Sequence, residues 1–327
     1  MMALLSLIAA VFPMVGFVIV VWWMDRYDRE PVSLIGLNFL WGAFGAVALA
    51  IIGSILLIAG IANLIKGKEE IELLSTVAVA PVVEESAKGL FLLVTATSRR
   101  FDNVTDGAVY GASIGFGFGM TENFLYFLSF PLAEGWVILV IIRTFFSAVM
   151  HAMATGVLGA FVGFAKFRPR RQQLFLWWFG WLIAVGFHVV WNSSVSFEGG
   201  FGYGVLFIIV GICILLALFQ ISLLYEHRVL LRELGEESLI DIIPVDHVTI
   251  LSSFRRRKRG GWCPPGVNRK AYIRLATELA FRKHQSRICQ PSKRELYLDD
   301  VGKLRERILM LRRAPLLDAD TRPMESV

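Results

Sequence analysis

The chain has 327 residues, of which 56% are hydrophobic, and a mean hydropathy of +0.61. Its apolar residues lie in continuous runs, which is typical of a protein that crosses a membrane several times and excludes a single soluble globular domain. The net charge of +6 comes from residues 227–327, which hold 21 Lys and Arg against 13 Asp and Glu. No DNA- or RNA-binding motif accompanies this charge, so nucleic acid is not expected as a partner.

Windows of about 20 residues predict an all-α, polytopic membrane bundle with about seven transmembrane helices. The expected spans lie near 4–23, 34–62, 71–97, 106–130, 136–165, 173–197 and 202–225. Residues 1–226 would then form the membrane domain. Residues 227–327 would form a basic cytoplasmic region that is small and mostly helical, with helices near 268–289 and 292–313.

Lys and Arg in the loops between these spans predict the orientation, because cytoplasmic loops are enriched in positive charge. The first loop contains Arg26 and Arg29, the third contains Arg99 and Arg100, and the fifth contains four basic residues. The fourth and sixth loops contain none. We therefore expect the N-terminus outside and the C-terminal region in the cytoplasm. The first span lacks a basic start and ends at an interfacial Trp pair, so it is expected to be a retained anchor.

A basic run at Arg255–Arg259 follows Phe254 in the C-terminal region and is followed by Gly260 and Gly261. Its simplest interpretation is a solvated linker beside the membrane, and an anionic lipid is the alternative partner. The three cysteines are scattered, so neither a disulfide framework nor a zinc-finger spacing is expected.

Two adjacent glutamates, Glu84 and Glu85, lie within the otherwise apolar stretch 71–96, and Lys88 follows one helical turn later. A charged side chain near the centre of a bilayer costs on the order of 3 kcal/mol. Such residues usually mark an ion path, a proton relay or a catalytic site. Pro81, just upstream, removes a helix hydrogen bond and predicts a kink.

Other spans carry polar residues at a matching depth. They are Glu122 in the fourth span, His151 in the fifth, and His188 with Asn192 in the sixth. Glu84 with Lys88 and His188 with Asn192 are i,i+4 pairs, so each pair shares a helix face. We therefore expect these side chains to meet in a cavity between helices instead of facing lipid.

Glycines recur at i,i+4 from Gly107 to Gly119, which allows a neighbouring helix to approach closely. Asp106 is most simply a helix N-cap. Arg143, about two turns into the fifth span, is expected to be a snorkelling or paired side chain.

Carboxylates and imidazoles in a partly dry cavity suit the activation of water, since burial lets one carboxylate act as a base while another stays protonated. His188 and Asn192 are suited to donate hydrogen bonds to the oxyanion of a tetrahedral intermediate. This chemistry favours amide hydrolysis within the membrane.

The same residues form four linked motifs in a fixed order. They are Pro81-Val-Val-Glu84-Glu85-Ser-Ala-Lys88; Asp106-Gly-Ala-Val-Tyr110-Gly with Phe118-Gly-Met-Thr-Glu122-Asn123; Arg143 to His151-Ala-Met-Ala-Thr-Gly156; and His188-Val-Val-Trp-Asn192. Over about residues 80–195 the chain resembles the PrsW family of bacterial intramembrane proteases. That family is related to the CAAX prenyl endopeptidase and bacteriocin-processing superfamily.

The resemblance implies cleavage of a membrane-embedded protein, single-pass or other, such as an anti-sigma factor, in a bacterial cytoplasmic membrane. The resemblance assigns Glu84 and Glu85 to the paired-glutamate motif, His151 to the third motif, and His188 with Asn192 to the HxxxN motif. Glu122 stands where the prenyl-endopeptidase branch has histidine, so the general base is left open among the three glutamates. The supporting residues are Lys88, Asn123 and Arg143.

Metal use stays open from the sequence alone. Metal-independent glutamate chemistry is our main hypothesis, because the helical zinc-protease motif HExxH is absent. The alternative is a zinc site formed by Glu122, His151 and His188 with a carboxylate from Glu84 or Glu85. A second alternative is a proton- or cation-coupled transporter that uses the buried glutamates. The oligomeric state is not predicted.

Overall fold

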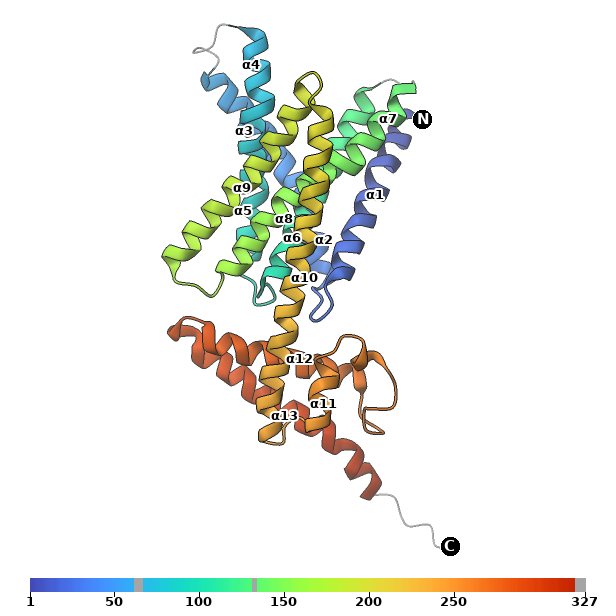
Figure 1. Cartoon of the computed structure of the whole chain (residues 1–327), viewed down its shortest axis with the longest axis vertical. Helices are drawn as coiled ribbons and strands as arrows, with labels where there is room; N and C mark the ends of the chain where they lie inside the picture. The colour runs from blue at the N-terminus through green and yellow to red at the C-terminus, as the bar shows by residue number, and fades with distance from the viewer. Residues whose placement is uncertain (62–66, 131–133, 321–327) are drawn as a thin grey trace. The chain divides into compact units, whose positions relative to one another are not determined.

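The computed structural model describes residues 1–61, 67–130 and 134–320 (Figure 1). Within these residues every regular element is a helix, and loops connect the helices. The chain divides into two compact units. The first, here called the membrane unit, comprises residues 1–25, 29–166 and 170–219. The second, the C-terminal unit, comprises 26–28, 167–169 and 220–327, of which 321–327 lie outside the described residues.

Helical stretches of the membrane unit follow the apolar runs of the sequence, and three of them contain a π-helical turn. In chain order they are α1 (Met2–Met24); α2 (Val32–Leu40) with η1 (Trp41–Ala46) and α3 (Val47–Ile61); α4 (Lys68–Leu74) with η2 (Ser75–Val79) and α5 (Ala80–Thr95); α6 (Val104–Ser129); α7 (Glu134–Ile142) with η3 (Arg143–Ser147) and α8 (Ala148–Ala165); α9 (Arg170–Ser196); and α10 (Phe201–Leu239), whose later part belongs to the C-terminal unit. The chain is therefore a polytopic helical membrane protein.

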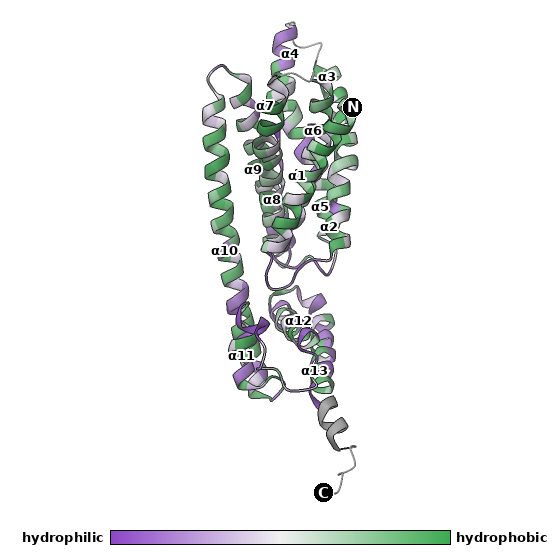
Figure 2. Cartoon of the chain, turned by 90° about the vertical axis from the view of Figure 1, so that its right-hand side faces the viewer, coloured by the Kyte–Doolittle hydropathy of each residue, from purple (hydrophilic) through white to green (hydrophobic). Residues whose placement is uncertain are grey.

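Five helices in the described part of the chain are long and apolar enough to cross a membrane. They cover Met2–Met24, Val32–Ile61, Gly135–Ala165, Arg170–Ser196 and Phe201–Leu239. Figure 2 shows that the residues of α1 and of the first part of α10 are mostly hydrophobic. The residues toward the end of α10 are hydrophilic.

The expected count of about seven spans is therefore only partly matched. Helices occupy the expected spans 71–97 and 106–130, but these two stretches are not among the five apolar ones. They carry the acidic residues of the predicted site, and α6 is also rich in glycine, so both are more polar than ordinary spans. The last residue of the expected span 34–62 lies outside the described residues.

Helix α6 is the central element of the membrane unit, where it packs against α8, α1, α2 and η1. It is buried almost continuously along its first two thirds. Its glycines allow direct backbone contact with α8: a Cβ at Gly115 would overlap the backbone of His151 and Ala152, and one at Gly159 would overlap that of Gly107. The glycine spacing predicts a close helix neighbour for α6. That neighbour is α8, and the contact between the two helices brings Glu122 beside His151.

The start of α6 corrects one expectation. Asn103, not Asp106, is the N-cap residue: its side chain accepts a hydrogen bond from the Asp106 amide. Asp106 is the third residue of the helix, and its carboxylate accepts hydrogen bonds from the amides of Asp102 and Asn103. The two side chains together form a capping box.

Two of the π-helical turns directly precede residues of the predicted site. Pro81, the second residue of α5, has no amide hydrogen, so the carbonyl four residues earlier loses its α-helical partner. The turn η2 lies immediately before it. The turn η3 similarly precedes His151 in α8. Such turns change the face on which the following side chains lie and are frequent at functional sites.

The C-terminal unit is built from the end of α10, α11 (Val245–Leu251), the short 3₁₀ turn η4 (Arg256–Lys258), α12 (Arg269–Ile288) and α13 (Pro291–Asp320). The last two lie where the sequence predicts helices. Its core includes Leu230, Leu234, Tyr272, Leu279 and Ile308.

The basic run differs from the expected solvated linker at one position. Arg257 is buried, and its guanidinium donates hydrogen bonds to the carbonyls of Arg26 and Tyr27 and to the hydroxyl of Thr277, all within the C-terminal unit. The other four residues of Arg255–Arg259 are exposed. The middle arginine is therefore a structural anchor.

Candidate active site

Glu85 is fully buried on α5 and is surrounded by hydrogen-bond donors. Its Oε1 lies 2.8 Å from Nζ of Lys88 and 3.1 Å from Nδ1 of His188. Its Oε2 accepts a hydrogen bond of 3.1 Å from the hydroxyl of Thr155 on α8. Both carboxylate oxygens are therefore in use, and α5, α8 and α9 meet at this side chain.

Lys88 places a positive charge inside the cluster with no exposed surface. Besides its contact with Glu85, its Nζ lies 2.9 Å from Nδ1 of His151 and 3.5 Å from Oε2 of Glu84. The ammonium group also lies 3.8 Å from the centre of the Phe118 ring, a cation–π contact. A buried charge is tolerated only when it is paired, and here the partners come from three helices.

Glu122, on α6, joins the cluster from the other side. Its Oε2 lies 2.6 Å from Nε2 of His151 and 2.8 Å from Nη2 of Arg143. The guanidinium of Arg143 also donates from Nε to Oδ1 of Asn123 at 3.0 Å. The expected paired role of Arg143 is thus present in the structure.

Each of the two imidazoles uses one ring nitrogen for a carboxylate. His188 has Nδ1 on Glu85, and His151 has Nε2 on Glu122. Because an ionised carboxylate only accepts hydrogen bonds, the network assigns the proton to these two nitrogens. Nε2 of His188 is then left with a lone pair, whereas Nδ1 of His151 accepts from the Lys88 ammonium group at 2.9 Å. The two rings lie edge to face with their centres 4.8 Å apart.

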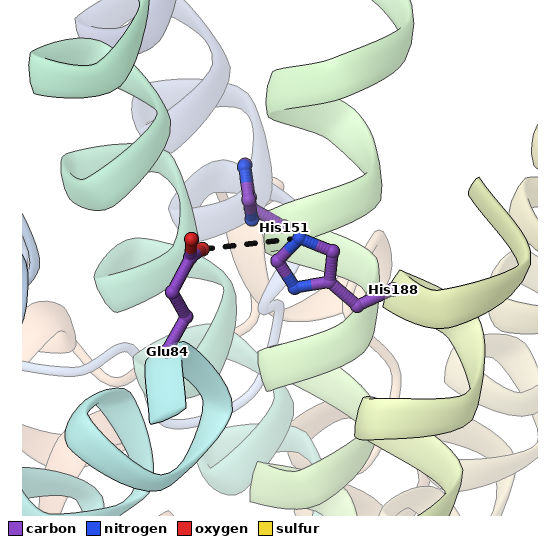
Figure 3. Close-up of side chains that lie close together, drawn as sticks. All are labelled: Glu84, His151 and His188. Carbon is purple, nitrogen blue, oxygen red and sulfur yellow. Dashed lines mark ion pairs between the residues drawn. The ribbon is translucent and has the colours of Figure 1, made fainter. Parts of the chain in front are cut away.

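Glu84 differs from the other two glutamates because its Oε2 is buried and has no hydrogen-bond partner among the described residues. This oxygen lies 3.8 Å from Nε2 of His188, the dashed line in Figure 3. Ligand atoms of Glu84, His151 and His188 all lie within 4.8 Å of one another. Figure 3 shows the three side chains converging from α5, α8 and α9.

Two imidazoles and one carboxylate are a donor set that catalytic zinc sites use, with a further position left for water or substrate. The donation of the second ring nitrogen to a carboxylate is typical of metal-binding histidines. Charge also fits, since the three carboxyl groups of the cluster outnumber its two cations, Lys88 and Arg143. The residues present therefore fit a divalent metal ion.

The structure brings together most of the predicted site residues but arranges them differently from the expected metal set. Glu84, not Glu122, groups with the two histidines. Nδ2 of Asn192 donates to the carbonyl of Thr76 in η2 at 2.9 Å. That contact ties α9 to the π-helical turn, and the oxyanion role of Asn192 stays a prediction.

Two contributing residues were missed by the sequence reasoning. Thr155 follows His151 by four residues, so helical spacing places both on the same face of α8, and this spacing was the available signal. Phe118 has the same i,i+4 relation to Glu122 on α6. An apolar ring and a lone threonine do not stand out in a membrane helix, so neither is conspicuous without the fold.

Comparisons with known proteins show which family the chain resembles. The family model described as "PrsW family intramembrane metalloprotease" matches residues 30–219. Three relatives are each named "Protease PrsW". The one from Geobacillus kaustophilus is 30% identical over 200 residues, which cover 61% of this chain and 83% of the relative.

The relative from Bacillus subtilis is 29% identical over 175 residues, covering 53% of this chain and 74% of its own length. The relative from Clostridioides difficile is 30% identical over 200 residues, covering 58% and 78%. No solved structure gives a significant match.

These findings confirm the resemblance and favour a peptidase over a transporter. The description of the family as metalloproteases also favours the zinc-dependent alternative over metal-independent glutamate chemistry. The chain belongs to the PrsW family of intramembrane metalloproteases.

Proposed function

We propose that the chain is a zinc-dependent endopeptidase that cleaves a peptide bond in a membrane-embedded protein, with Glu84, His151 and His188 holding the metal ion. The observation that carries this proposal is the convergence of ligand atoms from Glu84, His151 and His188, which all lie within 4.8 Å of one another. Two imidazoles and one carboxylate at such distances can hold zinc and leave a further position for water or substrate.

Bound zinc supplies an electrophile for the scissile carbonyl and lowers the pKa of a bound water molecule. The chain's own contribution is to fix the donor atoms. Glu85 holds the proton of His188 at Nδ1, and Glu122 holds the proton of His151 at Nε2. Nε2 of His188 then faces Glu84, and Nδ1 of His151 faces Nζ of Lys88, which zinc would have to displace from that nitrogen.

The depth of the site in the membrane depends on which helices cross the bilayer. We infer that the stretches α4–α5 and α6 cross the membrane together with the five apolar helices, which gives seven spans. The loop charges support an outside N-terminus and a cytoplasmic C-terminal region, in a bacterial cytoplasmic membrane. The site then lies at bilayer depth, which favours a substrate segment that is itself membrane-embedded, as in a signalling protein such as an anti-sigma factor.

The test uses the full chain in liposomes with a single-pass reporter protein. We expect zinc to copurify in stoichiometric amount, a chelator to abolish cleavage, and added zinc to restore it. Glu237→Gln, a change in the C-terminal unit, is the matched control and should cleave like the wild type. Cleavage that persists in chelator, by protein that contains no zinc, would contradict the proposal.

A further inference from the structure

One carboxylate oxygen connects Arg143 to His151. Oε2 of Glu122 lies 2.8 Å from Nη2 of Arg143 and 2.6 Å from Nε2 of His151. Arg143 is the first residue of η3, two helical turns before His151, whereas Glu122 comes from α6. The guanidinium therefore reaches the imidazole through a side chain of another helix.

Arg143 is itself held in one place by α6. Its Nε donates to Oδ1 of Asn123, and Nδ2 of the same asparagine donates to the Arg143 carbonyl at 3.3 Å. The asparagine is fully buried, and the guanidinium also lies 3.6 Å from the centre of the Tyr126 ring. These contacts fix both the main chain and the side chain of Arg143. The guanidinium therefore has little freedom of its own and can keep Glu122 in one position.

We propose that Arg143 is a positioning residue for the peptidase reaction, acting through Glu122 to hold the imidazole ring of His151 in place by its Nε2. This inference rests on the proposed zinc-dependent function. It gives Glu122 an orienting role, not that of the general base.

The physical reason lies in the chemistry of a carboxylate at this depth. Glu122 could turn away from His151 or lose its charge unless a cation holds it. A guanidinium can serve Glu122 and Asn123 at once through its fork of donors, whereas an ammonium group is a single point charge. Outer-shell partners of this kind typically change metal affinity by about 10–100-fold.

A different role for Arg143 makes a different prediction. If the guanidinium contacted the substrate directly, its removal would act independently of Glu122. A double-mutant comparison separates the two roles, because two residues that act in series do not add their effects.

The first experiment measures zinc affinity of the detergent-solubilised full chain by competition with a chelator of known affinity. We expect Glu122→Gln and Arg143→Gln each to weaken zinc binding by about 10–100-fold. The double variant should be no weaker than Glu122→Gln alone. Arg143→Lys should show a smaller loss than Arg143→Gln, and Arg170→Gln, at the exposed start of α9, is the control that should show none.

The second experiment needs no metal. In chain labelled with ¹⁵N-histidine and assigned with His151→Gln, the ring signals of His151 should show an Nε2-protonated tautomer in the wild type, because Glu122 accepts at Nε2 and Lys88 donates at Nδ1. In Arg143→Gln the Nε2 signal should shift as its hydrogen bond to Glu122 weakens, whereas the Nδ1 signal should change less. Asn123→Ala, which frees the guanidinium without removing it, should shift the signals in the same direction and replaces Arg143→Gln if that variant does not fold.

The inference is overturned if Arg143→Gln leaves both the zinc affinity and the Nε2 signal of His151 unchanged, or if losses in the double variant multiply. A wild type that binds no zinc would contradict the proposed function instead. The measurement of the Nε2 signal would still decide whether Arg143 orients His151 through Glu122.

Discussion

Two glutamates, Glu84 in the membrane unit and Glu237 in the C-terminal unit, show how differently the two regions use charge. Both oxygens of Glu237 face Arg305 at 2.7 and 2.8 Å, and Lys283 adds a contact of 2.7 Å. Oε2 of Glu84 has no hydrogen bond among the described residues, and Glu84 lies with two imidazoles in a group that could hold a metal ion. Glu237 is therefore suited to stabilise the fold, whereas Glu84 is suited to a ligand.

The same contrast extends to the surroundings. In the C-terminal unit the carboxylates of α10 are met by basic residues of α12 and α13, namely Lys283, Arg287 and Arg305. In the candidate site, the carboxyl groups of Glu84, Glu85 and Glu122 share two cations and two imidazoles. The charges of the C-terminal cluster are nearly balanced without a ligand, whereas the candidate site has fewer cations than carboxyl groups.

The largest effect expected from this contrast is on catalysis. Glu84→Gln, His151→Ala and His188→Ala each remove a proposed metal ligand, so cleavage of a membrane-embedded reporter should fall by on the order of 10³-fold or more. Glu237→Gln should leave cleavage nearly unchanged. Rates within tenfold of the wild type for any of the three would break the comparison.

The two neighbouring glutamates should differ in stability. Glu85→Gln leaves Lys88 buried without its strongest partner, so we expect a loss of about 3–5 kcal/mol in the free energy of unfolding. Glu84→Gln should cost less, because the Glu84 carboxylate lies 3.5 Å from Nζ of Lys88, whereas that of Glu85 lies at 2.8 Å and also accepts from His188 and Thr155. Thermal unfolding of both variants in the same detergent measures the order, and equal losses would contradict the distinction.

In the C-terminal unit, Arg305→Gln should be destabilising without affecting chemistry. It removes two charge-assisted hydrogen bonds from Glu237 while Lys283 remains, so about 1.5–3 kcal/mol is expected. Hydrogen exchange at the end of α10 and in α13 should rise. Arg307→Gln, on an exposed part of α13, is the control; no difference between the two variants would show that the ion pair is not structural.

The geometry of the candidate site, unlike that of the C-terminal cluster, should depend on the close backbone contact between α6 and α8. Gly159→Ala forces α8 away from α6, at a cost of about 1–3 kcal/mol, and should lower activity by displacing His151 from Glu122. Gly186→Ala, where nothing lies within 4 Å of the added carbon, is the matched control. Equal melting temperatures and cleavage rates for the two variants would argue against a role for this contact.

The smallest effect concerns pH. Burial, followed by the charges of Arg232 and Arg287, lowers the pKa of His284 to about 4 from 6.5. Between these values the unfolded chain binds a proton that the folded chain does not, so stability is present above about pH 6.5 and is lost as pH falls toward 4. Hydrogen exchange of α12 should rise between pH 7 and 5, and His284→Gln should reduce that rise. An unchanged pH response would contradict the assignment.

Much of the fold follows from the sequence because membrane helices are set by apolar runs of sufficient length. The expected span 173–197, for example, is α9, and the expected helix 268–289 is α12. The glycine spacing of α6 likewise predicts a close helix neighbour, and the structure identifies it as α8.

The arrangement of the site is less accessible to sequence reasoning. Depth along a helix can be counted, but the direction of a side chain depends on helix rotation, which the turns η2 and η3 alter. An inserted residue of this kind turns the following side chains by about 100°. This is why the sequence does not show which carboxylate groups with both histidines, and why it does not show the interhelical contact of Asn192 with Thr76.

The buried Arg257 shows a second limit. A run of basic residues is usually solvated, and its composition does not reveal which member folds inward. The choice is made by carbonyl groups of Arg26 and Tyr27, more than two hundred residues earlier in the chain.

X-ray absorption spectroscopy at the zinc edge of the purified full chain tests the central claim most directly. We predict a shell of nitrogen and oxygen donors that includes two imidazoles, and the loss of one imidazole contribution in His188→Ala. Protein that takes up no zinc, or zinc whose donor shell is the same in His188→Ala as in the wild type, would contradict the account.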